Sequence, residues 1–155
     1  MKRFLSLFLA ALMVLSLCAC GKKDSTDVDL SAFYETLFTE GDAPMMMELD
    51  EDLLDTFYPG LTEIPRLQTV AYAAAISSIP AEVVLVEVEH ADDAGKVEEI
   101  LQARVSYQVD DLGAWYPETI EGWKNHSEIV SIGNYVALFV ADSEDAMAES
   151  FRTLF

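Results

Sequence analysis

The pattern that most constrains the fold is an order of strand, strand and helix that occurs twice along the chain. The first occurrence begins with strand patterns at residues 69–77 (TVAYAAAIS) and 82–89 (EVVLVEVE), joined by a short loop that contains Pro80. A helical stripe then runs from about Ala91 to near Gly113. Residues in 82–89 alternate, with one face carrying Val84, Val86 and Val88 and the other carrying Val83, Leu85, Glu87 and Glu89. This part of the chain predicts a β-hairpin followed by a helix.

The second occurrence lies in the C-terminal part of the chain. Strand patterns at 128–132 (EIVSI) and 135–141 (YVALFVA) flank Gly133-Asn134, a dipeptide typical of tight turns. Acidic residues after Ser143 then open a helix. Its apolar stripe contains Met147, Phe151, Leu154 and Phe155. The second occurrence therefore predicts the same β-hairpin and helix order as the first.

Two short helices are expected before these units. The first has Asp29 as its N-cap, and its stripe contains Leu30, Phe33, Tyr34, Leu37 and Phe38. The second is expected within residues 49–57 and is stopped by Pro59-Gly60. It follows the run Met45-Met46-Met47, which can form an adaptable binding surface or bind a soft metal. Methionine more often fills gaps in a core, and we expect that role here.

Together these patterns predict an α+β fold with a two-layer architecture. We expect a four-stranded, mainly antiparallel sheet with helices on one face, built as two β-hairpin–helix units preceded by the two short helices. The second face would be solvated or covered by those first two helices. A chain of 155 residues suffices for one ordinary domain, which we place at residues 30–155.

The N-terminal segment has a different composition. Lys2 and Arg3 precede the apolar run 4–17, whose length suits a signal peptide and is short of the roughly 20 residues that span a bilayer. The run ends in Leu17-Cys18-Ala19-Cys20-Gly21, which resembles a bacterial lipobox. The resemblance implies signal-peptidase cleavage between Ala19 and Cys20, diacylglycerol on the Cys20 sulfur, and acylation of the new amino group.

This segment has three other interpretations. Cys18 is a poorer anchor because Leu17 would then stand where a small residue is wanted. A metal or redox pair of the two cysteines normally needs further ligands, and none follows nearby. A retained anchor helix from Phe4 to Cys20 is the strongest competitor, although its 17 residues are at the bottom of the spanning range. We therefore expect a lipoprotein signal peptide at 1–19, and the lipidated cysteine with a flexible tether at 20–29.

Charge excludes several partners. The chain has 28 Asp and Glu residues against 9 Lys and Arg, for a net charge of −19. Two of these nine bases lie in the leader, so the remainder is more acidic still. Phosphate backbones and anionic headgroups repel such a body, and we expect no nucleic-acid partner and no electrostatic membrane docking. Attachment to the membrane would depend on the diacylglycerol on Cys20.

The chain contains no catalytic motif that can be recognised by spacing. It lacks the nucleophile-elbow, zinc-protease, phosphate-loop and calcium-loop patterns. Its two histidines, His90 and His126, stand at the edges of expected elements, where a solvent-exposed or locally bonded role is usual. Asp92 and Asp93 beside His90 could bind a divalent cation, but the helix dipole already explains acids at a helix start. We predict no catalytic residue, no metal site and no cofactor.

An aromatic cluster is the best indication of a ligand site. Trp115, Tyr116 and Trp123 occur in GAWYPETIEGW, which reads as a loop, and such residues can stack on a sugar or a peptide. We take them as candidate ligand contacts. The competing interpretation, which we favour, is that the loop packs over the end of the sheet, because tryptophan is mostly buried.

Several segments together resemble a known family. They are the leader with its lipobox, MMELDEDLLDTFYPGL, AEVVLVEVEHADDAGKVEEILQARV, WYPE and GNYVALFVADSEDA. In this order they are similar to small lipoproteins of Gram-positive, Firmicutes-type bacteria that are grouped only under a domain of unknown function. The resemblance implies lipid anchoring at the outer face of the cytoplasmic membrane, and it implies no activity.

From these observations we expect a membrane-anchored lipoprotein of the cell envelope. A non-catalytic binding or assembly module, with an envelope protein or a cell-wall ligand as partner, is the favoured function. One alternative is an envelope enzyme that acts on glycan through acidic residues and the tryptophan-rich segment. A second alternative is a surface protein that binds cations through its acidic side chains.

Overall fold

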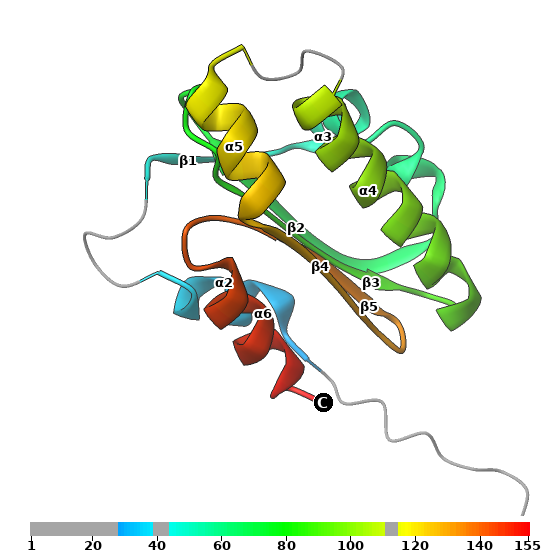
Figure 1. Ribbon diagram of the computed structural model, residues 1–155. Coiled ribbons are helices and arrows are strands. Elements are labelled where there is room, and N and C mark those ends of the chain that lie inside the picture. The colour runs from blue at the N-terminus through cyan, green and yellow to red at the C-terminus, as the bar shows by residue number, and fades with distance from the viewer. Residues whose placement is uncertain (1–27, 39–43, 111–114) are drawn as a thin grey trace, which may run out of the picture.

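The computed structural model describes residues 28–38, 44–110 and 115–155. Its helices are α2 (Leu30–Thr36), α3 (Glu51–Phe57), α4 (Ala94–Asp110), α5 (Pro117–Asn125) and α6 (Glu144–Arg152). Its strands are β1 (Met46–Glu48), β2 (Arg66–Ala74), β3 (Glu82–Val88), β4 (Ser127–Ile132) and β5 (Tyr135–Val140), and it has two 3-10 helices, η1 (Leu61–Glu63) and η2 (Ala91–Asp93). The strands form one open antiparallel sheet in the order β1-β2-β3-β5-β4 (Figure 1). The α+β class expected from the sequence is confirmed.

The central strand of the sheet is β3. Its residue Val86 pairs with Thr69 of β2 on one side and with Val136 of β5 on the other. β4 and β5 form a hairpin across Gly133, whose φ of 59° lies in the left-handed region that glycine tolerates. The tight turn predicted at this position is confirmed.

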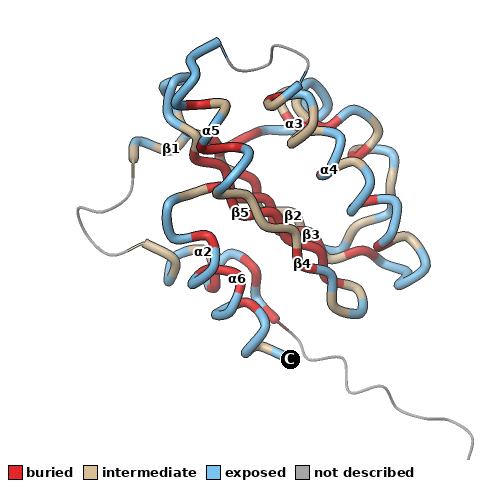
Figure 2. The backbone as a smooth tube through the Cα atoms, in the orientation of Figure 1, coloured by how far each residue is buried: buried red, intermediate tan, exposed pale blue. Residues whose placement is uncertain are grey.

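Helices cover both faces of the sheet, so the expectation of helices on one face is wrong (Figure 1). Helices α3, α4 and α5 lie over the face that carries Val84 and Val86, which we call the groove face. Helices α2 and α6 lie over the face that carries Val83 and Leu85. The predicted alternation along β3 is thus confirmed, but β5 is buried at all six positions and requires apolar cover on both sides (Figure 2).

The two hairpin–helix units differ in the face that their helix covers. α4 follows β3 and packs on the groove face through Val97 and Leu101. α6 follows β5 and packs on the opposite face through Met147 and Phe151. The units therefore share an order of elements without sharing an arrangement.

The sheet has five strands, and the expectation of four is wrong. The extra strand is β1, an edge strand in which Met46 pairs with Ala74 of β2. The expectation that this methionine run fills the core is wrong for Met45 and Met47, because their exposed fractions are 75% and 40%. Three residues are too few for a periodic signal, and β1 takes its form from backbone pairing with β2.

The segment expected as an aromatic loop contains a helix, α5. Proline at position 117 suits the first turn of a helix, where its missing N–H is not needed. The helix is fixed to the β2–β3 loop, because the Thr119 hydroxyl donates a hydrogen bond of 2.6 Å to the Ser78 carbonyl. Gly122 lies against the Pro80 ring, and an added Cβ there would overlap it. This close contact places Trp123 at the groove face of the sheet.

Helix α2 and the residue before its N-cap are hydrogen-bonded to β2 through one side chain, that of Gln68. Gln68 Nε2 donates to the Val28 carbonyl at 2.8 Å, and the Leu30 amide donates to Gln68 Oε1 at 3.0 Å. Asp29 accepts a hydrogen bond from the Ala32 amide at 3.0 Å, so its predicted N-cap role is confirmed. We refer to the contacts of Gln68 with Val28 and Leu30 as the Gln68 clamp.

Candidate functional site

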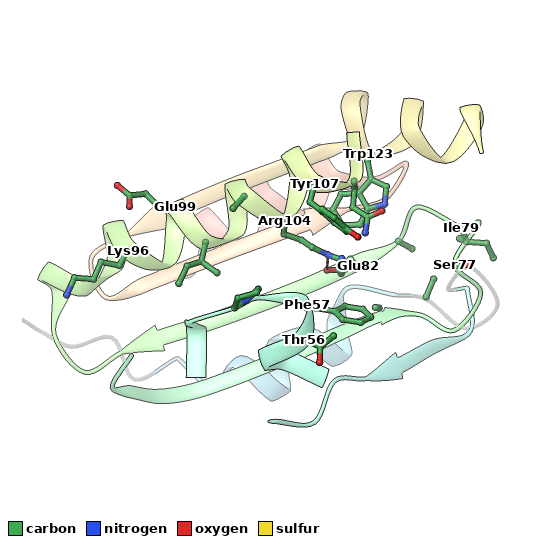
Figure 3. Close-up of a pocket in the computed structure, with 17 residues that line it drawn as sticks. Thr56, Phe57, Ser77, Ile79, Glu82, Lys96, Glu99, Arg104, Tyr107 and Trp123 are labelled. Carbon is green, nitrogen blue, oxygen red and sulfur yellow. Dashed lines mark hydrogen bonds and ion pairs between the residues drawn. The ribbon is translucent and has the colours of Figure 1, made fainter. Parts of the chain in front are cut away.

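A groove with a volume of about 880 Å³ lies on the groove face, between α4 and the segment of α3 (Figure 3). Its 17 lining residues come from α3 and the turn after it, the end of β2, the β2–β3 loop, the start of β3, α4 and α5. The volume is within the range usual for small-molecule sites, about 300–1,000 Å³. The groove is therefore large enough for a ligand of ordinary size.

Small side chains explain why the groove exists. Ala73 and Ala74 at the end of β2, Ala81 before β3 and Ala103 on α4 all line it. An alanine leaves space that a larger apolar residue would occupy in a close-packed interior. The alanines that make β2 an unusual strand sequence therefore produce the concave surface.

A buried ion pair stands in the groove. Arg104 Nε lies 3.1 Å from Glu82 Oε1, and Arg104 Nη2 lies 2.9 Å from Glu82 Oε2. The side chains are 10% and 3% exposed, respectively. The Tyr58 hydroxyl, which is also buried, donates a short hydrogen bond to Glu82 Oε1. A buried carboxylate is costly without partners, and both oxygens of this one are satisfied.

Aromatic rings surround the Arg104 guanidinium. Its carbon lies 4.4 Å from the centre of the Phe57 ring, 5.4 Å from Trp123 and 5.9 Å from Tyr58. These distances are within the range of cation–π attraction. The rings and the ion pair together hold the guanidinium in one position, with Phe57 pointing toward it from α3 (Figure 3).

Two pKa values are displaced by this environment. Burial raises the pKa of Tyr58 well above its ordinary value, and the charge of Glu82 raises it further. Burial by itself would lower the pKa of Arg104, but the hydrogen bonds and attraction of Glu82 outweigh burial, and the pKa is raised. The cluster therefore holds a neutral phenol and a charged guanidinium across the physiological range.

Of the two buried polar residues that line the groove, Glu82 is bonded and Gln108 has no side-chain partner within the described residues. It lines the groove, and its exposed fraction is 8%. Among residues 28–38, 44–110 and 115–155, no hydrogen bond to its side-chain amide is found. No fully enclosed side-chain nitrogen or oxygen in these ranges lacks a partner, so the amide is open to the groove. A side-chain amide that faces the groove, and whose donors and acceptor are not used by the fold, is a candidate ligand contact.

The charges that line the groove are balanced. Glu82 and Arg104 neutralise each other, and the remaining charged lining residues are Lys96 and Glu99. Lys96 also pairs with Asp93 at 2.7 Å outside the lining. The groove is thus locally neutral, in contrast to the net charge of −19 of the chain.

The three predicted aromatic contacts are separated by the structure. Trp123 is 3% exposed, belongs to the core of the groove face and lines the groove. Trp115 and Tyr116 are 86% and 56% exposed and are not among the groove-lining residues. Only Trp123 is therefore placed beside the Arg104 cluster.

Glu82, Arg104 and Gln108 were not predicted as site residues from the sequence. Glu82 is two residues before Val84, so the alternation along the strand places it on the same face as Val84 and Val86. An acid on this otherwise apolar face could have indicated a site. Arg104 lies three residues after Leu101, on the apolar stripe of α4, which was a second signal. Nothing in the sequence indicates that the amide of Gln108 lacks a partner, because that depends on tertiary packing.

The histidines lie outside the groove lining. His90 is exposed before η2, and His126 Nδ1 lies 3.2 Å from Glu144 Oε1. In the described ranges no group of three or more His, Cys, Asp or Glu residues could hold a metal ion. In the same ranges no helix has the length and apolar character to cross a membrane. Cys18, Ala19 and Cys20, on which the predicted anchor depends, lie outside the described residues.

The fold and the site define an α+β protein with a neutral, aromatic-walled groove on one face of an antiparallel sheet. Residues 39–141 match the family described as a domain of unknown function, DUF4358, and the chain belongs to this family. Comparisons with curated proteins and with solved structures found no match. The matched residues include all five strands and the whole lining of the groove, whereas α2 and α6 lie outside them.

Proposed function

We propose that this protein is a lipid-anchored lipoprotein of a Gram-positive cell envelope that binds a ligand in the groove without converting it. The observation that carries the binding role is the unpartnered amide of Gln108 in a groove of ligand size. The preference for binding over catalysis rests on Glu82, since both its oxygens are already bonded to Arg104 and Tyr58. A carboxylate so engaged is not presented to a substrate as an acid, base or nucleophile.

Blocking the groove tests the binding role. Ala103 is exposed on α4 and lines the groove, so Ala103→Trp would fill the space with little effect on the fold. Gln102→Trp, on the same helix but outside the groove lining, is the control. Ligands found by screening a small-molecule library against the wild-type protein should lose binding in Ala103→Trp and keep it in Gln102→Trp. Equal binding by both variants would refute the proposed site.

A glycan-directed enzyme is the second candidate. It is favoured by one observation, that Trp123 shares the groove with two carboxylates, the exposed Glu99 and Glu82, which would have to leave Arg104 to take part. Glycosidases use paired carboxyl groups, and a tryptophan can stack on a sugar ring. Release of reducing sugar from cell-wall polymer by the wild type, with loss of the activity in Glu99→Gln, would replace the binding proposal with this one.

The anchoring is proposed at Cys20, at the outer face of the cytoplasmic membrane. It rests on the lipobox-like segment at 17–21 and on the short apolar run before it. Labelling of bacteria with radioactive palmitate should mark the wild type and Cys18→Ala and should not mark Cys20→Ala. Equal labelling of Cys20→Ala would show that the anchor or its register is wrong.

A further inference from the structure

The geometry of the groove points to a ligand class: we propose that it binds an uncharged, mainly apolar molecule that carries a carboxamide. This proposal rests on the binding role proposed above and specifies the chemistry of the occupant. The shared chemistry is an amide between apolar groups, as found both in a blocked apolar peptide and in a non-peptide amide. Four observations support it: the Gln108 amide, the Arg104 guanidinium, the charge balance and the apolar walls.

The side chain of Gln108 supplies the specific recognition. A primary amide offers N–H donors and a carbonyl acceptor in one plane. A ligand amide presents the complementary pair, because its carbonyl can accept from Gln108 Nε2 while its N–H donates to Gln108 Oε1. The fold leaves this side chain without a hydrogen bond in the described ranges, although only 8% of the residue is exposed. A ligand amide would pair with both the donor and the acceptor of the Gln108 side chain. An ester would pair only with the donor, and a hydrocarbon with neither.

Arg104 supplies a positioned donor one turn away on the same face of α4. Its hydrogen bonds to Glu82 use Nε and Nη2, so the carboxylate does not engage Nη1. Because Arg104 lines the groove and is four residues before Gln108, both side chains lie on one side of the helix. A carbonyl oxygen between them can accept from both residues.

The charge balance disfavours ionic ligands. Arg104 already has its counter-charge in Glu82, and the other two charged lining residues, Lys96 and Glu99, are of opposite sign. An anionic ligand would compete with these carboxylates, and a cationic ligand would face the guanidinium in a site where burial of an unpaired charge is costly. The neutral form of the same molecule avoids both costs.

The walls set the apolar part of the ligand. Phe57, Ile79, Ile100 and Trp123 contribute large apolar or aromatic surfaces to the groove, and the alanines make its depth. Figure 3 shows Ile79 at the end near the β2–β3 loop and Lys96 with Glu99 at the other end, with Arg104 between. An amide bound at Gln108 and Arg104 thus has apolar surface available to carry groups on it.

The test uses full-length protein in lipid nanodiscs and isothermal titration calorimetry. The non-peptide probe is N-hexylbenzamide, and its control is hexyl benzoate, an ester of the same shape without the N–H. The peptide probe is N-acetyl-leucyl-leucinamide, and its charged controls are N-acetyl-leucyl-leucine and leucyl-leucinamide. Gln108→Leu removes the amide side chain, and Gln102→Leu makes the same change at an exposed position of the same helix.

We expect saturable binding of at least one neutral amide, about tenfold tighter than its ester or charged controls, as the loss of one buried hydrogen bond predicts. In Gln108→Leu the preference for amide over ester should fall to about onefold, and in Gln102→Leu it should stay unchanged. Because the Gln108 amide bonds nothing in the described fold, the midpoint of thermal unfolding should not fall in Gln108→Leu. The probe that binds identifies the source of the amide as peptide or non-peptide.

Two results would overturn the proposal, and they differ from failure of the binding role. Equal affinity for amide and ester in the wild type, or an amide preference that survives Gln108→Leu, would show that the amide is not recognised there. If library ligands still lose binding in Ala103→Trp, the groove remains a binding site and only the ligand class is wrong. If Ala103→Trp changes the binding of no ligand, the proposed function itself fails.

Discussion

The buried ion pair allows a quantitative prediction for the groove. Arg104→Met removes the guanidinium and leaves the Glu82 carboxylate, which is 3% exposed, with only the Tyr58 hydroxyl as a partner. Breaking a buried pair on one side costs about 3–5 kcal/mol, because a buried charge is left uncompensated. The loss of cation–π contact with Phe57 adds about 0.5–1 kcal/mol, of which the methionine regains a part.

Removing both charges should cost much less than removing one. In the double variant Glu82→Met/Arg104→Met, the remaining penalty is the buried Tyr58 hydroxyl without an acceptor, about 1–3 kcal/mol. Adding Tyr58→Phe removes that hydroxyl, so the triple variant should be within about 1 kcal/mol of the wild type. The order of stability is therefore wild type and triple variant, then double variant, then Arg104→Met.

Urea unfolding followed by far-ultraviolet circular dichroism measures these differences, provided that the dependence of the unfolding free energy on urea is the same in all variants. Gln102→Met, on the same helix at an exposed position, is the control and should be neutral. A loss below about 1 kcal/mol in Arg104→Met would mean that the pair behaves as an exposed one. A double variant less stable than Arg104→Met would likewise refute the reasoning.

Three further predictions concern the frame around the groove. Gly122→Ala should destabilise the protein by about 1–3 kcal/mol, because the new methyl group overlaps Pro80. Gly95→Ala has free space for its methyl group and should stabilise the protein by up to about 1 kcal/mol. Thermal unfolding of the two variants measures this difference. Asp50→Ala should cost about 1 kcal/mol in urea unfolding by removing the N-cap of α3, and Asp50→Asn should restore most of that loss. The pKa of Tyr58 is raised in the folded state above its ordinary 10.0. The stabilisation that the neutral phenol contributes is therefore complete below pH 10 and is lost as the pH rises further. The decline in unfolding free energy between about pH 9 and pH 11 should be shallower in Tyr58→Phe. An identical decline in both proteins would contradict the last prediction.

The predictable parts of the fold were those with long local patterns. The alternation in 82–89 correctly assigned the apolar residues of β3 to their faces, and Asp29 was correctly predicted as an N-cap. The strand β1 could not be found, because three residues carry no period and the strand exists through its pairing with β2. The face of the sheet that α6 covers could not be predicted either, because the apolar stripe of a helix shows only which side of the helix is buried.

The candidate site was predictable only in part. Trp123 was identified from its residue type, while Trp115 and Tyr116 proved to lie on the exposed surface. Glu82 and Arg104 each break an apolar pattern, but which acid and which base would meet depends on how α4 crosses the sheet. The lack of a partner at Gln108 is a property of the assembled groove, so no local pattern encodes it.

The Gln68 clamp decides how a pull on the N-terminus would pass through the molecule. Tension applied ahead of Val28 would reach β2 through the two hydrogen bonds of Gln68 and the stacked rings of Tyr34 and Tyr72, on the face of the sheet opposite the groove. If the chain is tethered at Cys20 as proposed, force from the membrane is carried by α2 and the strands, and it does not cross the gap between α3 and α4. The proposed binding surface would then keep its shape while the protein moves on its tether.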